Sequence, residues 1–471
     1  MLTLGHLAGN TSDIAVADVV VDSRQARAGS VFYALAGEHV DGHAYVSAAF
    51  AQGAIAAFVE HPVPDVRLVS PAEVAALRLG DLPVAIQVPN TLAALQEAAR
   101  RYRAELALDV VGITGSVGKT TAKEAIAAVL AEGYGVLKSQ GNANNEIGLP
   151  LTLLSARPEQ QVAVLEMGMY ALGEIALLCA LARPRIGVVT NVQPVHLERL
   201  GTIERIAQAK AELVEALPAD GVAVHNGDDP RVAAMADRHA GPSVLVGIGE
   251  ACHVRIADVV QQGLAGISFG LTVRGLEGLG VAPARRRLRC GLLGAHSAFP
   301  AALAVTVGLL EGLRWPQIER GLAQMGAGLR LIPRRGRRET TILDDSYNAS
   351  PSAVAGALGL LSSLPGRHVA VLGDMLELGA AAEASHLEVG ARCARQVDLL
   401  ITRGELAKGI ARGALAAGMP ADAVITVDDN AGALAALEAA AQPGDVILVK
   451  GSRGMAMESI VLAWQQPEEH A

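Results

Sequence analysis

A lysine and two threonines directly after a glycine-bearing turn form the segment of this chain best suited to phosphate chemistry. Apolar residues 109–113 predict a strand before the turn, and apolar residues at helical spacing predict a helix after it. Glycines let backbone N–H groups approach phosphate oxygens closely, and a helix N-terminus favours an anion. Lys119 can reach β- and γ-phosphates, and the Thr120 hydroxyl can bind Mg²⁺. The segment therefore predicts a phosphate-binding loop.

The loop departs from the strict phosphate-loop pattern, which has a glycine where this chain has Ile113. The alternative is a tight strand-to-helix turn with a surface lysine. The strand–turn–helix setting favours the phosphate loop, because a nucleotide-binding motif of this kind requires that context. The residues expected to contact the nucleotide here are Ile113, Thr114, Gly115, Ser116, Val117, Gly118, Lys119, Thr120 and Thr121.

Three further polar residues follow later strands or lie on the next helix. Glu166 follows the apolar run 162–165, at the sheet edge where ligands bind in doubly wound folds, and a carboxylate there suits Mg²⁺. His196 follows a predicted strand and, read alone, is an ordinary loop histidine. Lys210, read alone, is a surface helix residue, although residues 206–213 around it are unusually apolar and small.

Other polar clusters follow predicted strands toward both ends of the chain. Ser23 and Arg24 suit phosphate contacts, but a reading as turn residues is equally good. In the last third, the clusters 344–351, 373–379 and 450–454 each follow a strand. Polar loops on one sheet edge define a face. If that face turned toward the phosphate loop, a substrate would be enclosed between two domains.

The order of the predicted elements indicates three α/β domains. We expect a small N-terminal α/β domain over 1–85. A central doubly wound parallel sheet with a small antiparallel subsheet is expected over 86–332, and a C-terminal Rossmann-like domain over 333–471. Residues 81–89 contain two prolines and predict a linker. The arginine-rich run 330–338 predicts a solvated linker or a phosphate-facing hinge.

Composition argues against several classes of protein. The 471 residues are 51% hydrophobic and 18% charged, which is ample for buried cores. A net charge of −9 gives no indication of nucleic-acid binding. The four cysteines are scattered and predict reduced thiols. We expect no signal peptide, because Asp13 and Asp18 interrupt the N-terminal apolar residues. The apolar stretch 298–310 predicts a buried helix too short to span a bilayer. We expect a cytoplasmic monomer without membrane insertion.

These motifs together resemble the Mur ligase family, which builds the peptidoglycan precursor. The resemblance covers nearly the whole chain. It is most specific in the asparagine-rich loop 141–148 and in the runs 344–348 and 372–379. These three segments are similar to the family member that adds the dipeptide D-Ala-D-Ala, rather than to the member that adds a diamino acid. The runs 22–24 and 41–43 are common to both members.

The resemblance implies an ATP- and Mg²⁺-dependent amide ligase. ATP would phosphorylate the terminal carboxylate of UDP-N-acetylmuramoyl-tripeptide, and the amine of D-Ala-D-Ala would attack the acyl phosphate. Lys119, Glu166, His196 and Lys210 match catalytic positions of the family, and Thr120, Glu166 and His196 match its metal site. Lys210 also matches a lysine that is carbamylated in several members. Carbamylation turns an ammonium into a carboxylate-like metal ligand, which would explain the small, apolar surroundings.

The resemblance also implies contacts with the substrates. Ser23 and Arg24 would lie near the UDP part, and Asn144 and Asn145 near the muramoyl-peptide. Residues that would approach ATP or the dipeptide on domain closure are Arg330, Asp345, Tyr347 and Asn348.

One run departs from the family pattern. Residues 294–300 lack two asparagines that usually follow Gly-x-His, one of them near adenine. Either Ser297 and backbone groups hold the base, or the nucleotide affinity differs. Three alternative functions stay open: the related ligase that adds the third amino acid, a P-loop regulatory ATPase that acts on a partner, and an inactive binding protein. Whether the third residue of the peptide is diaminopimelate or lysine is also open.

Overall fold

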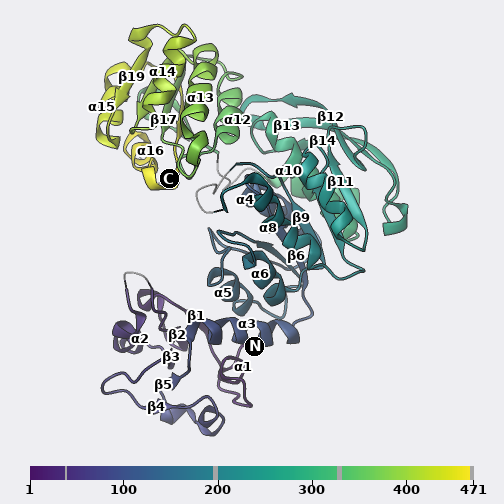
Figure 1. Cartoon of the computed structure of the whole chain (residues 1–471), viewed down its shortest axis with the longest axis vertical. Coiled ribbons are helices and arrows are strands. Elements are labelled where there is room, and N and C mark those ends of the chain that lie inside the picture. Colours follow the sequence, from purple (N-terminus) through teal and green to yellow (C-terminus); the bar gives the residue numbers. More distant parts are fainter. Residues whose placement is uncertain (38–39, 195–199, 326–330, 467–471) are drawn as a thin grey trace.

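Three β-sheets organise the protein. The computed structural model describes residues 1–37, 40–194, 200–325 and 331–466 (Figure 1). The sheets follow one another along the chain, and along the long axis of the molecule the central sheet lies between the N-terminal and C-terminal sheets (Figure 1). Each sheet has helices packed against it. The predicted α/β fold of three domains is confirmed.

The N-terminal sheet has five parallel strands in the order β1-β2-β3-β5-β4. The expectation of a linker over 81–89 is wrong, because β5 pairs with β3 and β4 inside this sheet. Pro83 and Pro89 flank β5, so their missing N–H groups remove no hydrogen bond from the ladder. The bounds are α1 Leu4–Ala8, β1 Asp18–Val20, β2 Ser30–Tyr33, α2 Val46–Ala51, β3 Ala56–Val59, β4 Leu68–Val69 and β5 Val84–Gln87.

The central sheet has nine strands in the order β14-β13-β12-β11-β10-β9-β6-β8-β7. The six strands β7, β8, β6, β9, β10 and β11, given in their order across the sheet, are parallel to one another, and β12 pairs with β11 in parallel. Strands β13 and β14 continue the sheet with antiparallel pairing. The predicted antiparallel subsheet is thus part of the same sheet. The bounds are β6 Asp109–Thr114, β7 Val136–Lys138, β8 Val162–Glu166, β9 Ile186–Val189, β10 Val222–Asn226, β11 Ser243–Gly247, β12 Val254–Gln261, β13 Ile267–Val273 and β14 Ala284–Cys290.

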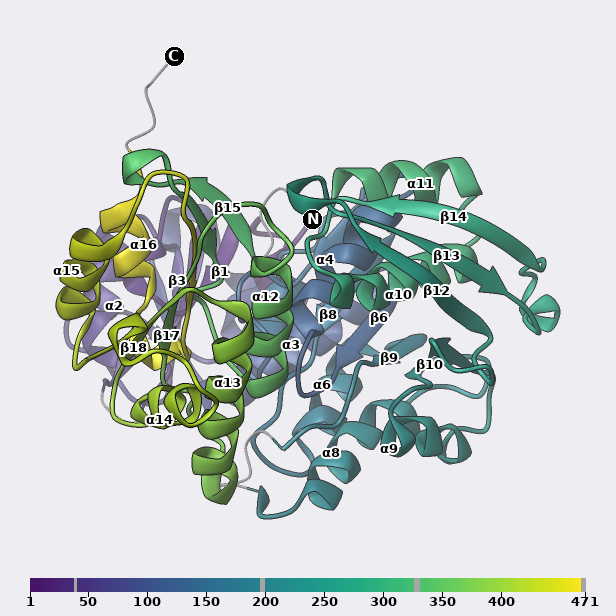
Figure 2. The same ribbon diagram turned by 90° about the horizontal axis from the view of Figure 1, so that it is seen from above.

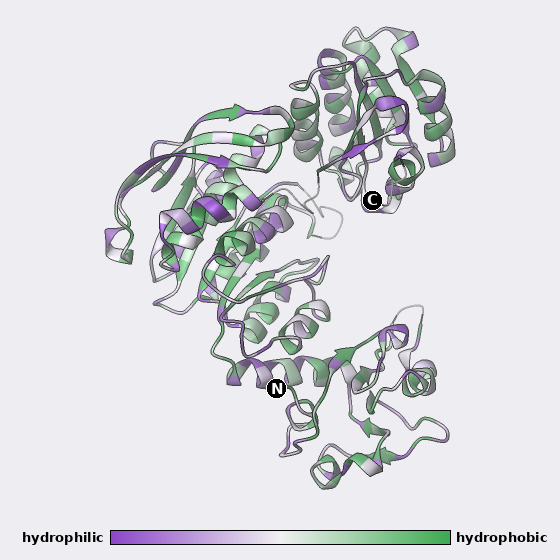
Figure 3. Cartoon of the chain, turned by 180° about the vertical axis from the view of Figure 1, so that it is seen from behind, coloured by the Kyte–Doolittle hydropathy of each residue, from purple (hydrophilic) through white to green (hydrophobic). Residues whose placement is uncertain are grey.

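Helices cover both faces of the parallel part of this sheet, as its nearly continuous apolar strands require (Figure 3). One hydrophobic cluster includes α4, α10 and α11, and another includes α3, α5, α6 and α8. The predicted buried helix over 298–310 is α10, and the predicted helix over 91–105 is α3. The bounds are α3 Thr91–Glu105, α4 Lys119–Leu130, α5 Gly148–Leu154, α6 Glu174–Ala182, α8 Ile203–Glu215, α9 Pro230–Ala233, α10 Ala298–Leu310 and α11 Trp315–Gln324.

The C-terminal sheet has six strands in the order β15-β16-β20-β17-β18-β19, all parallel except β15. Helices α12, α13 and α14 cover one face, and α15 and α16 the other. The basic run after residue 330 is no linker where it is described, because residues 332–335 form the edge strand β15. The bounds are β15 Ile332–Arg335, β16 Thr341–Asp344, α12 Pro351–Leu361, β17 His368–Gly373, α13 Ala382–Gln396, β18 Leu399–Arg403, α14 Lys408–Ala416, β19 Val424–Val427, α15 Asn430–Ala440, β20 Val446–Lys450 and α16 Glu458–Trp464.

Helix α12 of the C-terminal domain contacts the central domain near residues 295–297 (Figure 2). Within the described ranges, no helix has both the length and the apolar character needed to cross a membrane.

Candidate active site

The phosphate loop joins β6 to α4, as the sequence predicts. Gly115 has a φ of 147°, and a Cβ there would lie 1.9 Å from Oγ1 of Thr190, so only glycine fits. Gly118 has a φ of 83° and is the residue immediately before α4. The helix therefore begins at Lys119, with its first N–H groups and the positive end of its dipole at the loop.

Residues after β9 hold the loop in shape. Asn191 accepts a hydrogen bond from the Val117 N–H and donates one to the Val117 carbonyl oxygen, both at 2.9 Å. The Thr190 hydroxyl donates to the same carbonyl at 2.7 Å. The Lys119 ammonium donates to the Gly115 carbonyl at 2.7 Å. Sequence reasoning assigned no role to Thr190 or Asn191, because their part depends on a neighbouring strand rather than on a motif.

Glu166 lies directly beside the start of α4. The Thr120 hydroxyl donates to Oε2 of Glu166 at 2.9 Å, and the side-chain amide of Asn144 donates to Oε1 at 3.0 Å. Glu166 is 3% exposed. The structure thus brings together three of the predicted residues, and it places two oxygen ligands of the kind Mg²⁺ prefers at the N-terminus of the phosphate-binding helix. These residues fit a Mg²⁺ ion.

Lys210 is buried on α8, with 2% of its surface exposed, so the alternative of a surface helix residue is wrong. Burial is the main cause that lowers the pKa of Lys210 well below its usual value, and the positive charge of Lys119 lowers it further. The neutral amine is therefore favoured at this position. His196 and Arg330, which the sequence also placed at the site, lie outside the described residues.

The remaining predicted substrate residues lie in several places. Arg24 forms an ion pair with Asp22 at 2.7 Å and is largely exposed at the end of β1. Asn145 lies in the turn before α5, where its side-chain oxygen accepts from Gly148 N–H at 2.9 Å. A pocket of about 780 Å³ joins the two regions. It is lined by residues that include Gln25, Glu124, Gln140, Ala143, Gly148 and Thr152.

The C-terminal cluster is organised around a buried lysine. The Lys450 ammonium donates to Oδ2 of Asp345 at 2.6 Å and to the Asn348 carbonyl at 2.8 Å, and Lys450 is 2% exposed. The Arg453 guanidinium lies over the Tyr347 ring, 5.4 Å from its centroid. The three predicted residues of this segment thus gather at the carboxyl ends of β16 and β20, with a lysine that the sequence placed in a separate loop.

A hydrogen-bonded path connects this domain to the phosphate loop. The Ser116 hydroxyl donates to the Gln193 carbonyl at 3.0 Å and accepts from the Gln193 N–H at 2.9 Å. The Gln193 side chain accepts from the Ser352 hydroxyl at 2.7 Å, at the first turn of α12. The run that departs from the family pattern lies nearby, and the Ser297 hydroxyl donates to the Leu293 carbonyl at 2.7 Å.

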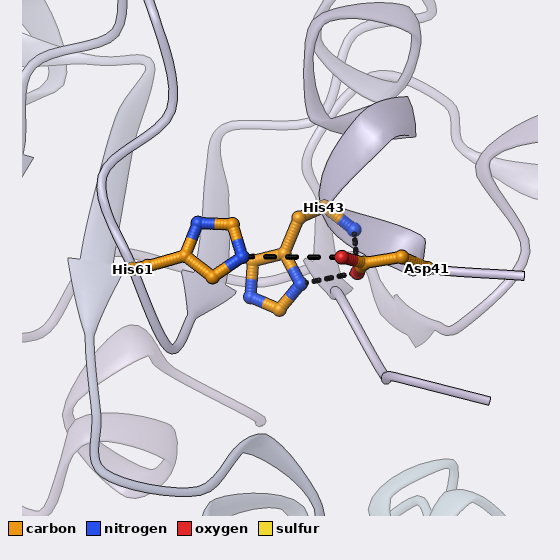
Figure 4. A group of neighbouring side chains, drawn as sticks. All are labelled: Asp41, His43 and His61. Atoms are coloured by element: carbon orange, nitrogen blue, oxygen red, sulfur yellow. Dashed lines mark hydrogen bonds and ion pairs between the residues drawn. The ribbon is translucent and has the colours of Figure 1, made fainter.

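A second group of possible metal ligands lies in the N-terminal domain and does not suit a metal. Asp41, His43 and His61 have potential ligand atoms close together (Figure 4). The Nδ1 atom of His43 lies 2.6 Å from Asp41, and its Nε2 accepts from the Glu60 N–H at 2.8 Å. Since Nε2 is an acceptor, the proton of a neutral ring is on Nδ1. A metal ion could bind Nδ1 only after that proton had left. Because Nε2 would still accept from Glu60, the ring would then have no proton on either nitrogen.

Sequence comparison identifies related proteins along nearly the whole chain. Three family descriptions match: "Mur ligase family, catalytic domain" over residues 16–103, "Mur ligase middle domain" over 113–307 and "Mur ligase, glutamate ligase domain" over 330–453. The UDP-N-acetylmuramoyl-tripeptide–D-alanyl-D-alanine ligase of Bacillus subtilis is 38% identical over 447 residues, covering 94% of this chain and 92% of that protein. The Escherichia coli enzyme of the same name is 34% identical, covering 98% and 96%.

Solved structures agree with these relatives. MurF from Acinetobacter baumannii superposes with a TM-score of 0.82 at 26% identity, covering 98% of both chains. MurF ligase from Thermotoga maritima, solved in complex with ADP, gives a TM-score of 0.79 at 27% identity, covering 96% of this chain and 98% of that one. On the relatives' identity and coverage, and in agreement with the resemblance found in the motifs, this chain belongs to the Mur ligase family.

Proposed function

We propose that this protein is an ATP-dependent ligase that adds D-Ala-D-Ala to UDP-N-acetylmuramoyl-tripeptide and so completes the pentapeptide of the peptidoglycan precursor. The names of the relatives support the reaction. The observation that carries it is the contact between Thr120 and Glu166 at the start of α4, because it combines a phosphate loop with two oxygen ligands. Such a site suits transfer of a γ-phosphate to a carboxylate.

The residues of the central domain have distinct roles in this reaction. The first N–H groups of α4 and Lys119 hold the β- and γ-phosphates. Thr120, Glu166 and, from the family resemblance, His196 would hold Mg²⁺, which would offset the repulsion between the triphosphate and the carboxylate. Asn144 fixes the direction of the Glu166 carboxylate. The terminal carboxylate of the tripeptide then attacks the γ-phosphate, ADP leaves, and the dipeptide amine displaces phosphate from the acyl carbon.

Lys210 is proposed to carry a carbamate. Its buried amine is favoured in the neutral form, which is the form that adds to CO₂. The reaction forms a bond between Nζ and the carbon of CO₂ and releases one proton. The product is an anion with two oxygens, and it would lie near the positive charge of Lys119.

The substrates are proposed to lie between the domains. Ser23 and Arg24 would contact the UDP part, and Asn144 and Asn145 the muramoyl-peptide. The pocket lined by Gln25 and Ala143 supports this, because these residues adjoin the two predicted contact segments. Residues proposed to contact ATP or the dipeptide from the C-terminal side are Arg330, Asp345, Tyr347 and Asn348. We further propose the three domains expected from the sequence, over 1–85, 86–332 and 333–471, with the first boundary moved beyond β5, which ends at Gln87. We also propose a monomer and a cytoplasmic location where both nucleotides are available.

The test is an ADP-release assay with paired substrates. UDP-muramoyl-tripeptide with D-Ala-D-Ala should release ADP and form the pentapeptide, identified by its mass. UDP-muramoyl-dipeptide with diaminopimelate or lysine is the matched comparison. ADP release with the second pair alone would replace our proposal by the ligase that adds the third amino acid. Tripeptides ending in diaminopimelate and in lysine, compared at equal concentration, would identify the acceptor.

A further inference from the structure

Helix α4 carries a second lysine, Lys123, which is buried and has no role in the reaction described above. Lys123 follows Thr120 by three residues, so both lie on one side of the helix. Lys123 is 1% exposed, whereas Lys138, which pairs with the same carboxylate, has a side chain that is 38% exposed. A buried ammonium is costly unless it has partners. Its partners therefore indicate what it does.

The partners of Lys123 are the end of β7 and a neighbouring carboxylate. Its Nζ donates to the Ser139 carbonyl at 2.7 Å and lies 3.1 Å from the Glu124 carboxylate. Glu124 also pairs with Lys138 at 2.5 Å. Lys123 thus fastens Ser139, which is itself 1% exposed, to the phosphate-binding helix.

Ser139 in turn holds Glu166, the last residue of β8. Its hydroxyl oxygen accepts from the backbone N–H of Glu166 at 3.1 Å, and its own N–H donates to the Val164 carbonyl at 3.2 Å. The loop that begins at Ser139 returns to Glu166 a few residues later. There Asn144 donates to the Glu166 carboxylate, and its carbonyl accepts from Gly168 N–H at 2.8 Å.

We propose that Lys123 is a positioning residue for the magnesium site: through Ser139 it sets the place of the Glu166 carboxylate relative to the Thr120 hydroxyl. Both ends of the path start on α4, so the two oxygen ligands are held from one helix, Thr120 directly and Glu166 through Lys123 and Ser139. The inference rests on the proposed function, because it concerns the metal that the ligase would use. The described partners of Lys123 are Ser139 and Glu124, and not the two proposed metal ligands, Thr120 and Glu166. The positioning role also requires no contact between Lys123 and substrate.

The test compares Lys123→Met with Lys138→Met. Both variants remove a lysine that pairs with Glu124, but Lys138 does not hold Ser139. Mn²⁺ is titrated into each protein with ADP present, and the free ion is measured by electron paramagnetic resonance. Removing a group that orients a metal ligand costs roughly 10- to 100-fold in metal affinity. We expect a loss of about tenfold or more for Lys123→Met, and wild-type affinity for Lys138→Met.

A second pair keeps the test decisive if Lys123→Met fails to fold. Ser139→Ala removes the oxygen that accepts from Glu166, and Ser139→Thr retains it. Ser139→Ala should weaken Mn²⁺ binding and raise the Mg²⁺ concentration needed for ADP release, whereas Ser139→Thr should restore both. Wild-type Mn²⁺ affinity in Lys123→Met or in Ser139→Ala would overturn the positioning role. A wild-type protein that releases no ADP with any substrate pair would instead refute the proposed function.

Discussion

The hydroxyl of Thr120 donates a hydrogen bond of 2.9 Å to Oε2 of Glu166, although 46 residues separate them in the chain. The two meet because β6 and β8 are neighbours in the central sheet, with Ile113 opposite Glu166. Thr120 is the second residue of α4, the helix that follows β6, and Glu166 is the last residue of β8. The carboxyl ends of parallel strands therefore place a phosphate loop and a carboxylate within direct contact.

Thr120→Val should abolish most of the ADP release, whereas Thr120→Ser should retain it. Valine has nearly the shape of threonine but removes the oxygen that contacts Glu166, and serine keeps it. We expect a loss of at least about tenfold for the valine variant, as for other changes next to metal sites. The thermal unfolding midpoint of each variant serves as the control for folding. Wild-type turnover in Thr120→Val would show that this oxygen has no part in the reaction.

Lys210→Ala should abolish ligation, and short carboxylates such as formate or acetate should restore part of it. The small anion would occupy the space of the proposed carbamate in the buried site. In the wild-type protein, depletion of CO₂ should lower the rate, and bicarbonate should return it. ¹³C-labelled bicarbonate should give a carbamate NMR signal that is absent from the variant. Full activity of Lys210→Ala would refute the role.

The sequence predicted most strands and helices of the catalytic core to within a few residues, because buried parallel strands are continuous apolar runs. Residues 186–189 are strand β9 as predicted, and 91–105 are helix α3. Strand β5 was missed because its flanking prolines resemble a linker, and β15 because an edge strand tolerates arginines. Strand β14 belongs to the predicted antiparallel subsheet although four of its residues are exposed arginines, which the edge of a sheet likewise tolerates.

The candidate site was predictable only where a motif carried it. Lys119, Thr120 and Glu166 stand in recognisable runs after strands, and Lys210 was singled out by its apolar neighbours. Their supports were not predictable, because Asn191 and Ser139 act through side-chain hydrogen bonds to segments distant in sequence. Single serines and asparagines at such places have no local pattern, so only the packed structure reveals them.

His225 should make the protein less stable as the pH falls from 6.5 to 4. Burial, with a smaller contribution from the charge of His239, lowers the pKa of His225 to about 4. Between these values the unfolded chain binds a proton that the folded chain does not, so acid favours unfolding. At 1.36 kcal/mol per pH unit, the full loss is about 3 kcal/mol. Urea unfolding of wild-type protein and His225→Leu at pH 7.0, 5.5 and 4.5 measures it. As the pH falls, the free energy of unfolding of the wild-type protein should decrease relative to that of His225→Leu. A difference between the two proteins that stays constant with pH contradicts the prediction.

Lys450→Met should destabilise the C-terminal domain more than the double variant Lys450→Met with Asp345→Asn. The single change removes the ammonium that lies 2.6 Å from the nearly buried Asp345 carboxylate, while the negative charge of that carboxylate remains. Breaking a buried pair in this way costs about 3–5 kcal/mol, whereas removing both charges costs less. Chemical denaturation of the wild-type protein, Lys450→Met, Asp345→Asn and the double variant gives the four free energies of unfolding that a double-mutant cycle needs. Equal loss in the single and double variants would show that the ion pair itself contributes little.

Gln193→Leu should loosen the C-terminal domain from the phosphate loop without changing nucleotide contacts. The side chain of Gln193 accepts from Ser352 of α12, while its backbone bonds to Ser116 do not depend on the side chain. One such hydrogen bond contributes about 1 kcal/mol, which corresponds to roughly a fivefold change in the population of this domain arrangement. Small-angle X-ray scattering of the protein without substrates should detect a broader distribution of distances in Gln193→Leu and in Ser352→Ala. Because both variants remove the same bond, they should agree, and the double variant should add nothing further. Additive effects of the two changes would mean that each residue holds the domains through some other contact.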